Sequence, residues 1–143
     1  MPKLLVFGLV IILLLFIAGF VLYKKSAFFT YWLGRPDVRV VRYIAYIEGS
    51  GNPKLRLDLY LPKDTKDFPM VYFVHGGYWR TGDKNYFEWL TGLYGNIGVA
   101  LAGQGIGVAV ANYRLYPEAK IDDEIADVAV GVSWMKTHAA DYG

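Results

Sequence analysis

The hydrophobic and polar positions of this chain divide it into one long apolar run and a series of shorter, patterned segments. Residues 4–22 are apolar or glycine without interruption, whereas residues 38–48 and 55–61 alternate apolar with polar side chains. Alternation with a period of two is typical of β-strands, and the connecting residues 49–53 (Gly-Ser-Gly-Asn-Pro) have the composition of a turn. The pattern therefore predicts two strands paired as an antiparallel hairpin.

Two compact apolar runs farther along predict buried strands. Residues 70–74 read Met-Val-Tyr-Phe-Val, and residues 105–111 read Gly-Ile-Gly-Val-Ala-Val-Ala. Runs without polar residues are typical of parallel strands that are covered on both faces. We therefore expect both segments to lie inside a sheet as parallel strands.

Two further segments repeat apolar residues at steps of three or four, which is the spacing of one helix face. The first predicted helix covers residues 86–104, although its three glycines each cost about 1 kcal/mol relative to alanine. The second begins near residue 121, where acidic side chains favour a helix N-terminus. The glycines of the first helix are Gly92, Gly95 and Gly98, and the acidic side chains of the second are Asp122, Asp123 and Glu124. The expected packing face of the first helix is Phe87, Leu90, Tyr94, Ile97 and Leu101. The expected packing face of the second is Ile121, Ile125, Val128, Val132, Met135 and Ala139.

The order of these predicted elements is hairpin, strand, helix, strand, helix. Strands that alternate with helices in this way are typical of α/β domains with a partly parallel sheet. The sequence thus predicts the front half of an α/β sheet over residues 38–143.

The apolar run at the start of the chain has the length of a membrane span. As a helix, 19 residues extend about 28 Å, close to the thickness of a bilayer core. We expect residues 1–25 to form an uncleaved transmembrane anchor that contacts the lipid bilayer through residues 4–22. A cleaved secretory signal is the alternative, because lysines flank the run on both sides.

The expected anchor is followed by a juxtamembrane linker over residues 26–37. Four aromatic residues in it suit the headgroup region of a membrane, where amphipathic rings are favoured. They are Phe28, Phe29, Tyr31 and Trp32. Lys and Arg are in excess after the run, which favours a cytoplasmic domain, but an exported anchored protein would begin similarly, so the side of the membrane stays open.

Composition narrows the possible chemistry. The chain has 143 residues, a net charge of +2 and no cysteine, so neither a thiol nucleophile nor a disulfide is available. Its basic residues are scattered, which gives no reason to expect nucleic acid as a partner. No cofactor is expected, because residues 103–107 depart from a dinucleotide loop: Val108 stands at the third glycine position and a strand follows instead of preceding.

The most informative stretch is residues 75–79, His-Gly-Gly-Tyr-Trp, which come directly after the predicted strand at residues 70–74. Glycines let the main chain turn sharply with its N–H groups exposed. Preorganised N–H groups stabilise the negative charge that develops on a carbonyl oxygen during acyl transfer. The loop therefore suggests acyl-transfer chemistry.

Three sequence blocks in order resemble the α/β-hydrolase esterases and lipases that carry an HGG-x-W oxyanion motif. The blocks are residues 57–62 (LDLYLP), 75–79 (HGGYW) and 112–118 (NYRLYPE). The resemblance covers residues 55–143 and extends to feruloyl-esterase-like enzymes, prenylcysteine methylesterases and kynurenine formamidases. It implies a small-molecule carboxylic ester as substrate.

The same resemblance assigns roles within the loop. It implies that backbone N–H groups of Gly76, Gly77 and Tyr78 form the oxyanion hole and that His75 shapes the loop. Tyr78 stands where many relatives have a third glycine, so its side chain narrows the approach. Tyr78 and Trp79 are candidates to line the acyl or leaving-group pocket, with simple packing as the alternative.

In that family a strand ending in a G-x-S-x-G nucleophile elbow follows this region, and Asp or Glu and then His come later. The serines of this chain are Ser26, Ser50 and Ser133, and none has the elbow context. We therefore expect no catalytic nucleophile, acid or base within this chain, and we expect them beyond Gly143. The chain resembles a hydrolase domain truncated before its elbow.

Other polar residues receive structural interpretations. Arg114 is expected to pair with a carboxylate that fixes the following loop. A metal site is rejected for Asp122, Asp123, Glu124 and Asp127, because no histidine is spaced to join them. His138 and Ser133 lie about 140° apart around a helix, so they do not form a triad.

The sequence thus predicts the N-terminal part of a membrane-anchored serine carboxylic-ester hydrolase. One alternative is an amidase of the kynurenine-formamidase type, since the same loop serves amide hydrolysis. The other is a short, noncatalytic membrane-anchored protein that binds a partner through an open sheet edge.

Overall fold

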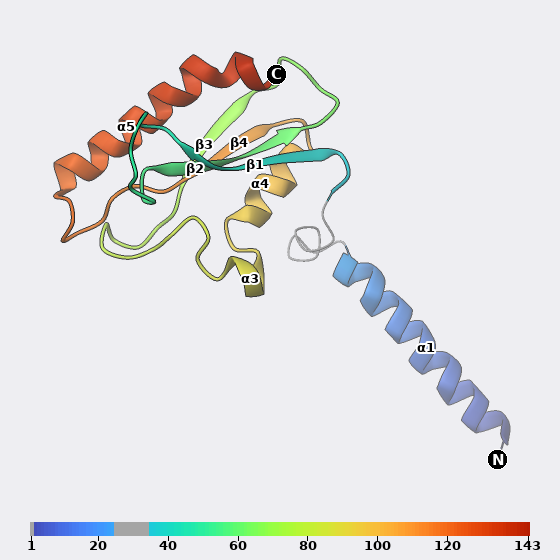
Figure 1. The fold of residues 1–143 in the computed structure, drawn as a ribbon. Helices are drawn as coiled ribbons and strands as arrows, with labels where there is room; N and C mark the ends of the chain where they lie inside the picture. Colours follow the sequence, from blue (N-terminus) through green and yellow to red (C-terminus); the bar gives the residue numbers. More distant parts are fainter. Residues whose placement is uncertain (1, 25–34) are drawn as a thin grey trace.

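The protein has one mixed sheet with helices on both faces (Figure 1). The computed structural model describes residues 2–24 and 35–143. Four strands lie in the order β1-β2-β4-β3, so the chain crosses over between β3 and β4. In Figure 1, α5 covers one face of the sheet and α4 the other. This arrangement confirms the predicted α/β fold class.

The predicted hairpin is present as β1 (Val38–Ala45) and β2 (Arg56–Pro62), which pair antiparallel. Their register shifts between Val41 and Ile44, where Tyr43 has a φ of 60°. An extra residue of this kind is a β-bulge, and it bends the strand locally. The bulge turns the N–H of Tyr43 toward a carboxylate oxygen of Asp58, 2.8 Å away.

The two apolar runs form β3 (Met70–Val74) and β4 (Gly107–Ala111), which pair in parallel. All five residues of β4 are buried, because β4 lies between β2 and β3. The expectation that residues 70–74 are also covered on both faces is wrong: β3 is an edge strand of the described sheet and Val71 is 41% exposed.

The single helix predicted over residues 86–104 is also wrong. The structure has two short helices, α3 (Glu88–Thr91) and α4 (Gly95–Ala102). Gly92 ends α3 in the left-handed conformation with a φ of 66°, and Tyr94 at the start of α4 also has a φ of 66°. Such angles cannot continue a helix. Of the two, α4 packs against the sheet through Val99 and Ala102, whereas Leu90 of α3 is 52% exposed.

The last helix, α5 (Ile121–His138), begins where predicted and continues into a short 3-10 turn, η1 (Ala139–Tyr142). Its predicted packing face is wrong in part, because Ile121 and Ile125 are 46% and 52% exposed. The side chains that α5 buries are Glu124 and Asp127, with Gly131 between helix and sheet. A Cβ on Gly131 would meet the Tyr72 hydroxyl, so the glycine permits this close approach.

The core has two halves, one on each face of the sheet. Leu57, Leu59 and Leu61 point to the α5 side and pack with Ala109 and Ala111. Tyr60 lies on the α4 side with Val108, Val110, Val99 and Ala102. The ring of Tyr60 lies so close to α4 that a Cβ at Gly98 would be 2.4 Å from it. Both faces of β2 are therefore buried from Leu57 to Pro62, including the charged position Asp58.

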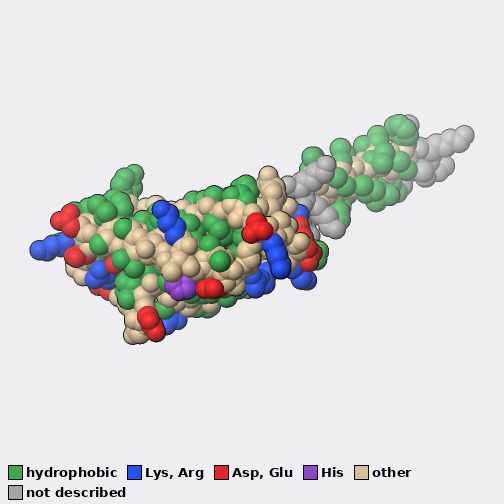
Figure 2. Space-filling model, turned by 90° about the horizontal axis from the view of Figure 1, so that it is seen from above, with side chains coloured by type: hydrophobic (Ala, Val, Ile, Leu, Met, Phe, Trp, Pro, Cys, Tyr) green, Lys and Arg blue, Asp and Glu red, His purple; other side chains and the backbone are tan. Residues whose placement is uncertain are grey.

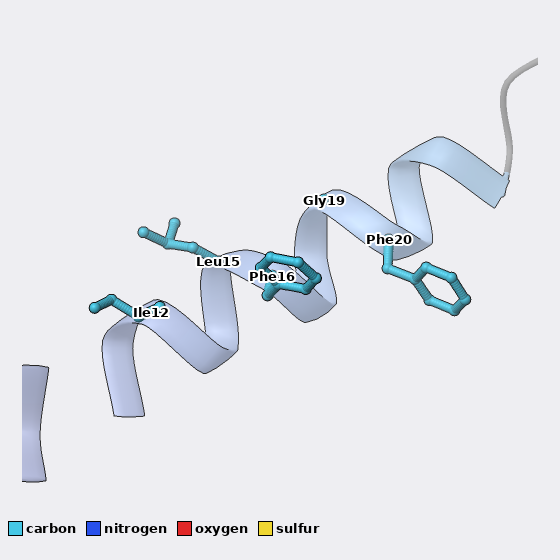
Figure 3. A pocket seen from close by; sticks show the side chains of 5 residues that line it. All are labelled: Ile12, Leu15, Phe16, Gly19 and Phe20. Atoms are coloured by element: carbon cyan, nitrogen blue, oxygen red, sulfur yellow. The ribbon is translucent and has the colours of Figure 1, made fainter. Parts of the chain in front are cut away.

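Helix α1 (Pro2–Lys24) precedes the domain. Its described apolar side chains are exposed (Figures 2 and 3). Phe7 near its start is 68% exposed, and Leu22 near its end is 71% exposed. Figure 3 shows Ile12, Leu15, Phe16 and Phe20 projecting from the helix near Gly19. Within the residues that the structure describes, no helix meets the length and hydropathy of a membrane span. The aromatic cluster predicted at residues 28–32 lies outside the described residues.

Candidate active site

The site is built from the loop that follows β3. Gly77 has a φ of 131°, and Tyr78 and Trp79 follow with left-handed φ values of 56° and 62°. The N–H groups of Arg80 and Thr81 both donate to the Gly77 carbonyl at 3.1 Å, which closes a tight turn. A Cβ at Gly77 would lie 1.9 Å from the Thr81 carbonyl oxygen. Only glycine fits this position without moving the turn.

The turn leaves several backbone donors without an acceptor. Within residues 35–143, no hydrogen-bond partner is found for the N–H groups of Gly76, Gly77 or Tyr78. Two consecutive left-handed residues other than glycine are uncommon, and each costs about 1 to 3 kcal/mol. Strain of this kind is concentrated at functional sites, where the surrounding structure holds it in place.

A cavity of about 340 Å³ lies beside this loop. Tyr78 and Trp79 line it, together with Arg80, Tyr116, Lys120, Ile121 and Glu124. Tyr78 is 94% exposed, so its side chain makes little packing contact in the described chain. Trp79 is 39% exposed and meets the Tyr113 ring edge-on at 5.2 Å. Both rings are thus placed at the cavity, and Trp79 also packs against the domain.

His75 supports the loop from beneath. Its side chain is buried, and the ring stacks on Tyr113 at 4.7 Å. Nδ1 donates to the Gly76 carbonyl at 2.9 Å, while the Tyr113 hydroxyl donates to the His75 carbonyl at 3.1 Å. Gly82 makes room for the ring, because a Cβ there would be 2.4 Å from Nδ1. These contacts hold the His75 ring against the backbone of the loop, and its loop-shaping role stays a prediction.

Burial lowers the pKa of His75 below its usual value, although the hydrogen bond to the Gly76 carbonyl opposes the shift. The unfolded chain takes up this proton near pH 6.5, whereas the folded chain takes it up at lower pH. The free energy of unfolding should therefore fall as the pH drops below about 6.5. Urea unfolding of the His75→Gln variant should show a weaker loss between pH 7 and 5.

His138→Gln is the matched control for that experiment, because it removes the other histidine of the chain and keeps His75. This variant should retain the steeper pH dependence of the parent. If the two variants have the same dependence, His75 is not the group responsible.

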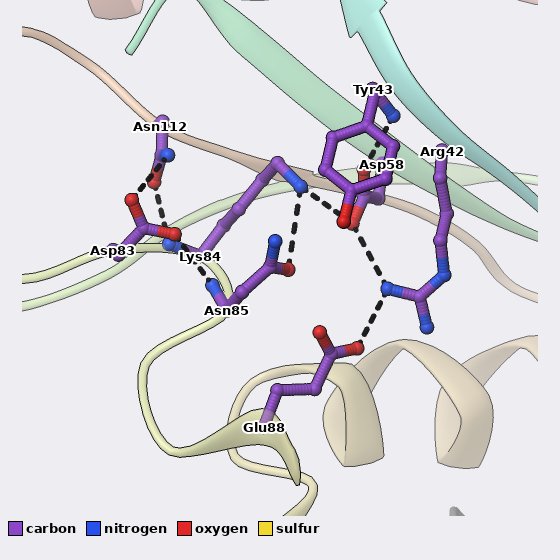
Figure 4. Close-up of polar contacts among 8 residues, drawn as sticks. All are labelled: Arg42, Tyr43, Asp58, Asp83, Lys84, Asn85, Glu88 and Asn112. Carbon is purple, nitrogen blue, oxygen red and sulfur yellow. Dashed lines mark hydrogen bonds and ion pairs between the residues drawn. The ribbon is translucent and has the colours of Figure 1, made fainter. Parts of the chain in front are cut away.

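A cluster of charged and polar side chains fixes the far end of the loop (Figure 4). Lys84 Nζ and Asp58 Oδ2 form an ion pair at 2.7 Å, and both side chains are almost fully buried. Lys84 Nζ also lies 4.5 Å from the centre of the Tyr43 ring. The guanidinium of Arg42 joins Asp58 at 3.5 Å to Glu88 at 2.7 Å. The cluster therefore links the loop, the hairpin and α3.

Asn112, at the end of β4, connects the same loop to the sheet. Its side-chain oxygen accepts the N–H of Lys84, and its amide nitrogen donates to Asp83 at 2.9 Å. Asp83 also pairs with Lys54 at 2.9 Å. The sequence did not reveal this cluster: Asp58, Asp83 and Lys84 read as polar loop or strand positions. The signal that could have found it is a charged residue within a strand whose neighbours are all leucine or tyrosine.

Arg114 makes the structural contact that was predicted. Its guanidinium binds Asp127 of α5 through two hydrogen bonds of 2.8 and 2.7 Å, and its backbone N–H donates to the same carboxylate. The Asp127 carboxylate raises the pKa of Arg114 above its usual value. This pair ties the start of α5 to the end of β4. Both carboxylate oxygens of Asp127 therefore bind Arg114.

The acidic residues of α5, His138 and residues 103–107 make contacts that are structural. Asp122, Asp123 and Glu124 lie in the first turn of α5, as predicted, and the described residues contain no cluster suited to a metal ion. His138 stacks on Trp134 at 4.6 Å and its Nδ1 contacts the Trp134 carbonyl, away from any triad. Residues 103–106 follow the end of α4 and lead into β4, with Gly105 at a φ of 85°.

A strand that ends in a loop with N–H donors and is paired in parallel with the next strand is the arrangement that α/β-hydrolases have around the oxyanion loop. The chain matches the BD-FAE family over residues 57–143. This range holds all three sequence blocks and the whole cavity. The chain belongs to this family of α/β-hydrolase esterases.

Two curated relatives are plant enzymes. A probable isoprenylcysteine alpha-carbonyl methylesterase of Arabidopsis thaliana is 39% identical over 114 residues, which are 79% of this chain and 21% of the relative. A protein of the same description from Oryza sativa subsp. japonica is 34% identical over 137 residues, which are 95% of this chain and 29% of the relative.

Solved structures agree on the fold. Esterase B from Lactobacillus rhamnosis, in an inhibited form, superposes with a TM-score of 0.64 at 28% identity. The match covers 88% of this chain and 40% of that protein. The chain thus spans between 21% and 40% of the length of these relatives.

Proposed function

We propose that this chain carries the oxyanion-stabilising part of a serine hydrolase that cleaves carboxylic esters. The observation that supports this most directly is that the N–H groups of Gly76, Gly77 and Tyr78 have no hydrogen-bond partner among the described residues and lie beside a cavity lined by Tyr78 and Trp79. Donors that are fixed before the reaction need no reorganisation when charge develops on the substrate oxygen. The family and its esterase relatives support the same reaction class.

In this proposal a serine attacks the ester carbonyl, a histidine takes the serine proton and later gives it to the leaving alcohol, and an acidic residue orients the histidine. The amides of residues 76–78 hold the resulting oxyanion. The family pattern places the serine, the acid and the histidine after the region seen here, and none of the three serines of this chain stands in a G-x-S-x-G context. By itself the chain is therefore expected to be inactive.

We also propose that residues 4–22 anchor the protein in a membrane. The support is a helix that spans Pro2–Lys24, with exposed apolar side chains on every turn whose side chains are described. Burying such a surface in lipid would be strongly favourable, at about 25 cal/mol per Å². Extraction of cell membranes with alkaline carbonate tests the anchor, which should stay in the pellet; release into the supernatant would contradict it.

A substrate panel tests the reaction. The gene product that carries residues 1–143 together with a nucleophile elbow should hydrolyse phenyl acetate and short acyl esters, and it should react with a fluorophosphonate probe at the elbow serine. The 143-residue chain should do neither. Turnover of N-formylkynurenine without ester turnover would favour the amidase instead. No turnover and no labelling in any form would favour a noncatalytic interaction protein.

A further inference from the structure

One residue that lines the cavity beside the donor loop differs from the others in its burial. Six of its seven lining residues are exposed, and only Glu124 is buried, with 1% of its surface accessible. Glu124 comes from the first turn of α5, whereas Tyr78 and Trp79 come from the loop after β3. The cavity is thus lined by exposed aromatic and basic residues and by one buried carboxylate.

This carboxylate is incompletely satisfied. Within the described residues, Glu124 Oε2 is buried and has no hydrogen-bond partner. The neighbouring acids of α5 are committed, because Asp127 binds Arg114 and Asp123 accepts the backbone N–H of Lys120. A buried charge without a donor is unfavourable, so it is expected to gain from any ligand that supplies one.

The walls suit a cation as well. Three aromatic residues, Tyr78, Trp79 and Tyr116, line the cavity, and aromatic ring faces attract ammonium groups. The two cations of the lining, Arg80 and Lys120, are exposed, and the Arg80 guanidinium lies 5.0 Å from the centre of the Tyr116 ring. Solvent screens these rim charges, whereas it does not screen the buried carboxylate.

We infer that this cavity binds the protonated amine of the substrate, with Glu124 as the specificity-determining residue, so that the preferred substrates are amine-bearing carboxylic esters. Tyr78 contributes its N–H to the donor loop and its ring to the cavity. Because Tyr78 and Glu124 line the same cavity, the amine and the ester carbonyl are expected to belong to one substrate molecule. The inference rests on the proposed ester hydrolysis for its chemistry, but the binding step is separate from it.

The test compares two ligands of equal size with the full chain in detergent micelles at pH 7. Phenethylamine is protonated at this pH, and 2-phenylethanol is neutral. Isothermal titration calorimetry should give a dissociation constant at least about tenfold lower for the amine, the preference expected of a desolvated cation between aromatic rings and a carboxylate. Glu124→Gln keeps the shape of the side chain and should reduce the preference to less than about threefold.

Asp122→Asn is the matched control. It removes one acidic charge from the same helix turn, but Asp122 is exposed and does not line the cavity. It should keep the preference for the amine. Equal affinities for the two ligands, no saturable binding, or a preference that survives Glu124→Gln would each overturn the inference. In those cases the longer form that carries the nucleophile elbow would still hydrolyse neutral phenyl acetate, whereas absence of all ester turnover by that form would overturn the proposed function alone.

Discussion

Replacing Asp58 by alanine is expected to lower the free energy of unfolding by about 3 to 5 kcal/mol, the usual effect of breaking a buried ion pair from one side. Among the described residues, the polar partner that remains for the buried Lys84 ammonium is the Asn85 side chain, 3.3 Å away. The N–H of Tyr43 in the β-bulge also loses its acceptor. Urea unfolding of the full chain, followed by circular dichroism, measures the loss.

Two variants separate charge from hydrogen bonding. Asp58→Asn retains an oxygen that can accept the Tyr43 N–H, so it should be less destabilising than Asp58→Ala while still losing the ion pair. Asp37→Ala removes the partner of Arg35 in a half-exposed pair of 2.6 Å, and exposed pairs contribute at most about 1 kcal/mol. Equal losses for Asp58→Ala and Asp37→Ala would show that the buried cluster adds nothing special to stability.

Gly77→Ala is expected to lower kcat for ester hydrolysis by roughly 10² to 10³ in the active, longer form of the protein, with a small change in KM. A Cβ at this position would lie 1.9 Å from the Thr81 carbonyl oxygen, and the φ of 131° is unfavourable for alanine. The turn must shift, and the N–H groups of Gly77 and Tyr78 shift with it. Steady-state kinetics on phenyl acetate give both constants.

Gly76→Ala is the control in the same loop. Nothing lies within 4 Å of a Cβ there, and the backbone does not have a left-handed φ. We expect its kcat to stay within several-fold of the parent. Melting curves of both variants show whether either has lost its fold. A Gly77→Ala enzyme that folds and retains its kcat would remove the loop from the oxyanion role.

The sequence predicted those parts of the fold whose signals are local. Alternating leucines predicted the hairpin, and β3, β4 and the start of α5 lie where the apolar runs and the acidic residues of the first helical turn placed them. The break between α3 and α4 was missed because the periodicity of Phe87, Leu90, Tyr94 and Ile97 outweighed the glycine at position 92. Backbone conformation, and not side-chain pattern, decided that break.

Neighbours in space explain the rest. The orientation of α5 depends on Gly131 fitting under Tyr72 and on the Arg114–Asp127 pair, and these contacts turn Ile121 and Ile125 outward. The Asp58–Lys84 pair joins residues 26 positions apart, so no local pattern announces it. The donor loop was predictable because its chemistry is in consecutive residues, whereas Glu124, which lines the same cavity, comes from a separate helix.

The two borders of the described sheet differ in their capacity to accept another strand. On the β1 side, the bulge at Tyr43 and the side chains of Arg39 and Arg42 interrupt a regular ladder. On the β3 side, five apolar residues run without a bulge or a charge, and the next strand inward is fully buried. Edge strands without bulges or charges readily pair with another strand, whereas bulges and charged side chains discourage such pairing. A further strand of this sheet, whether from the same polypeptide or from a partner protein, is therefore expected to pair with β3 (Met70–Val74).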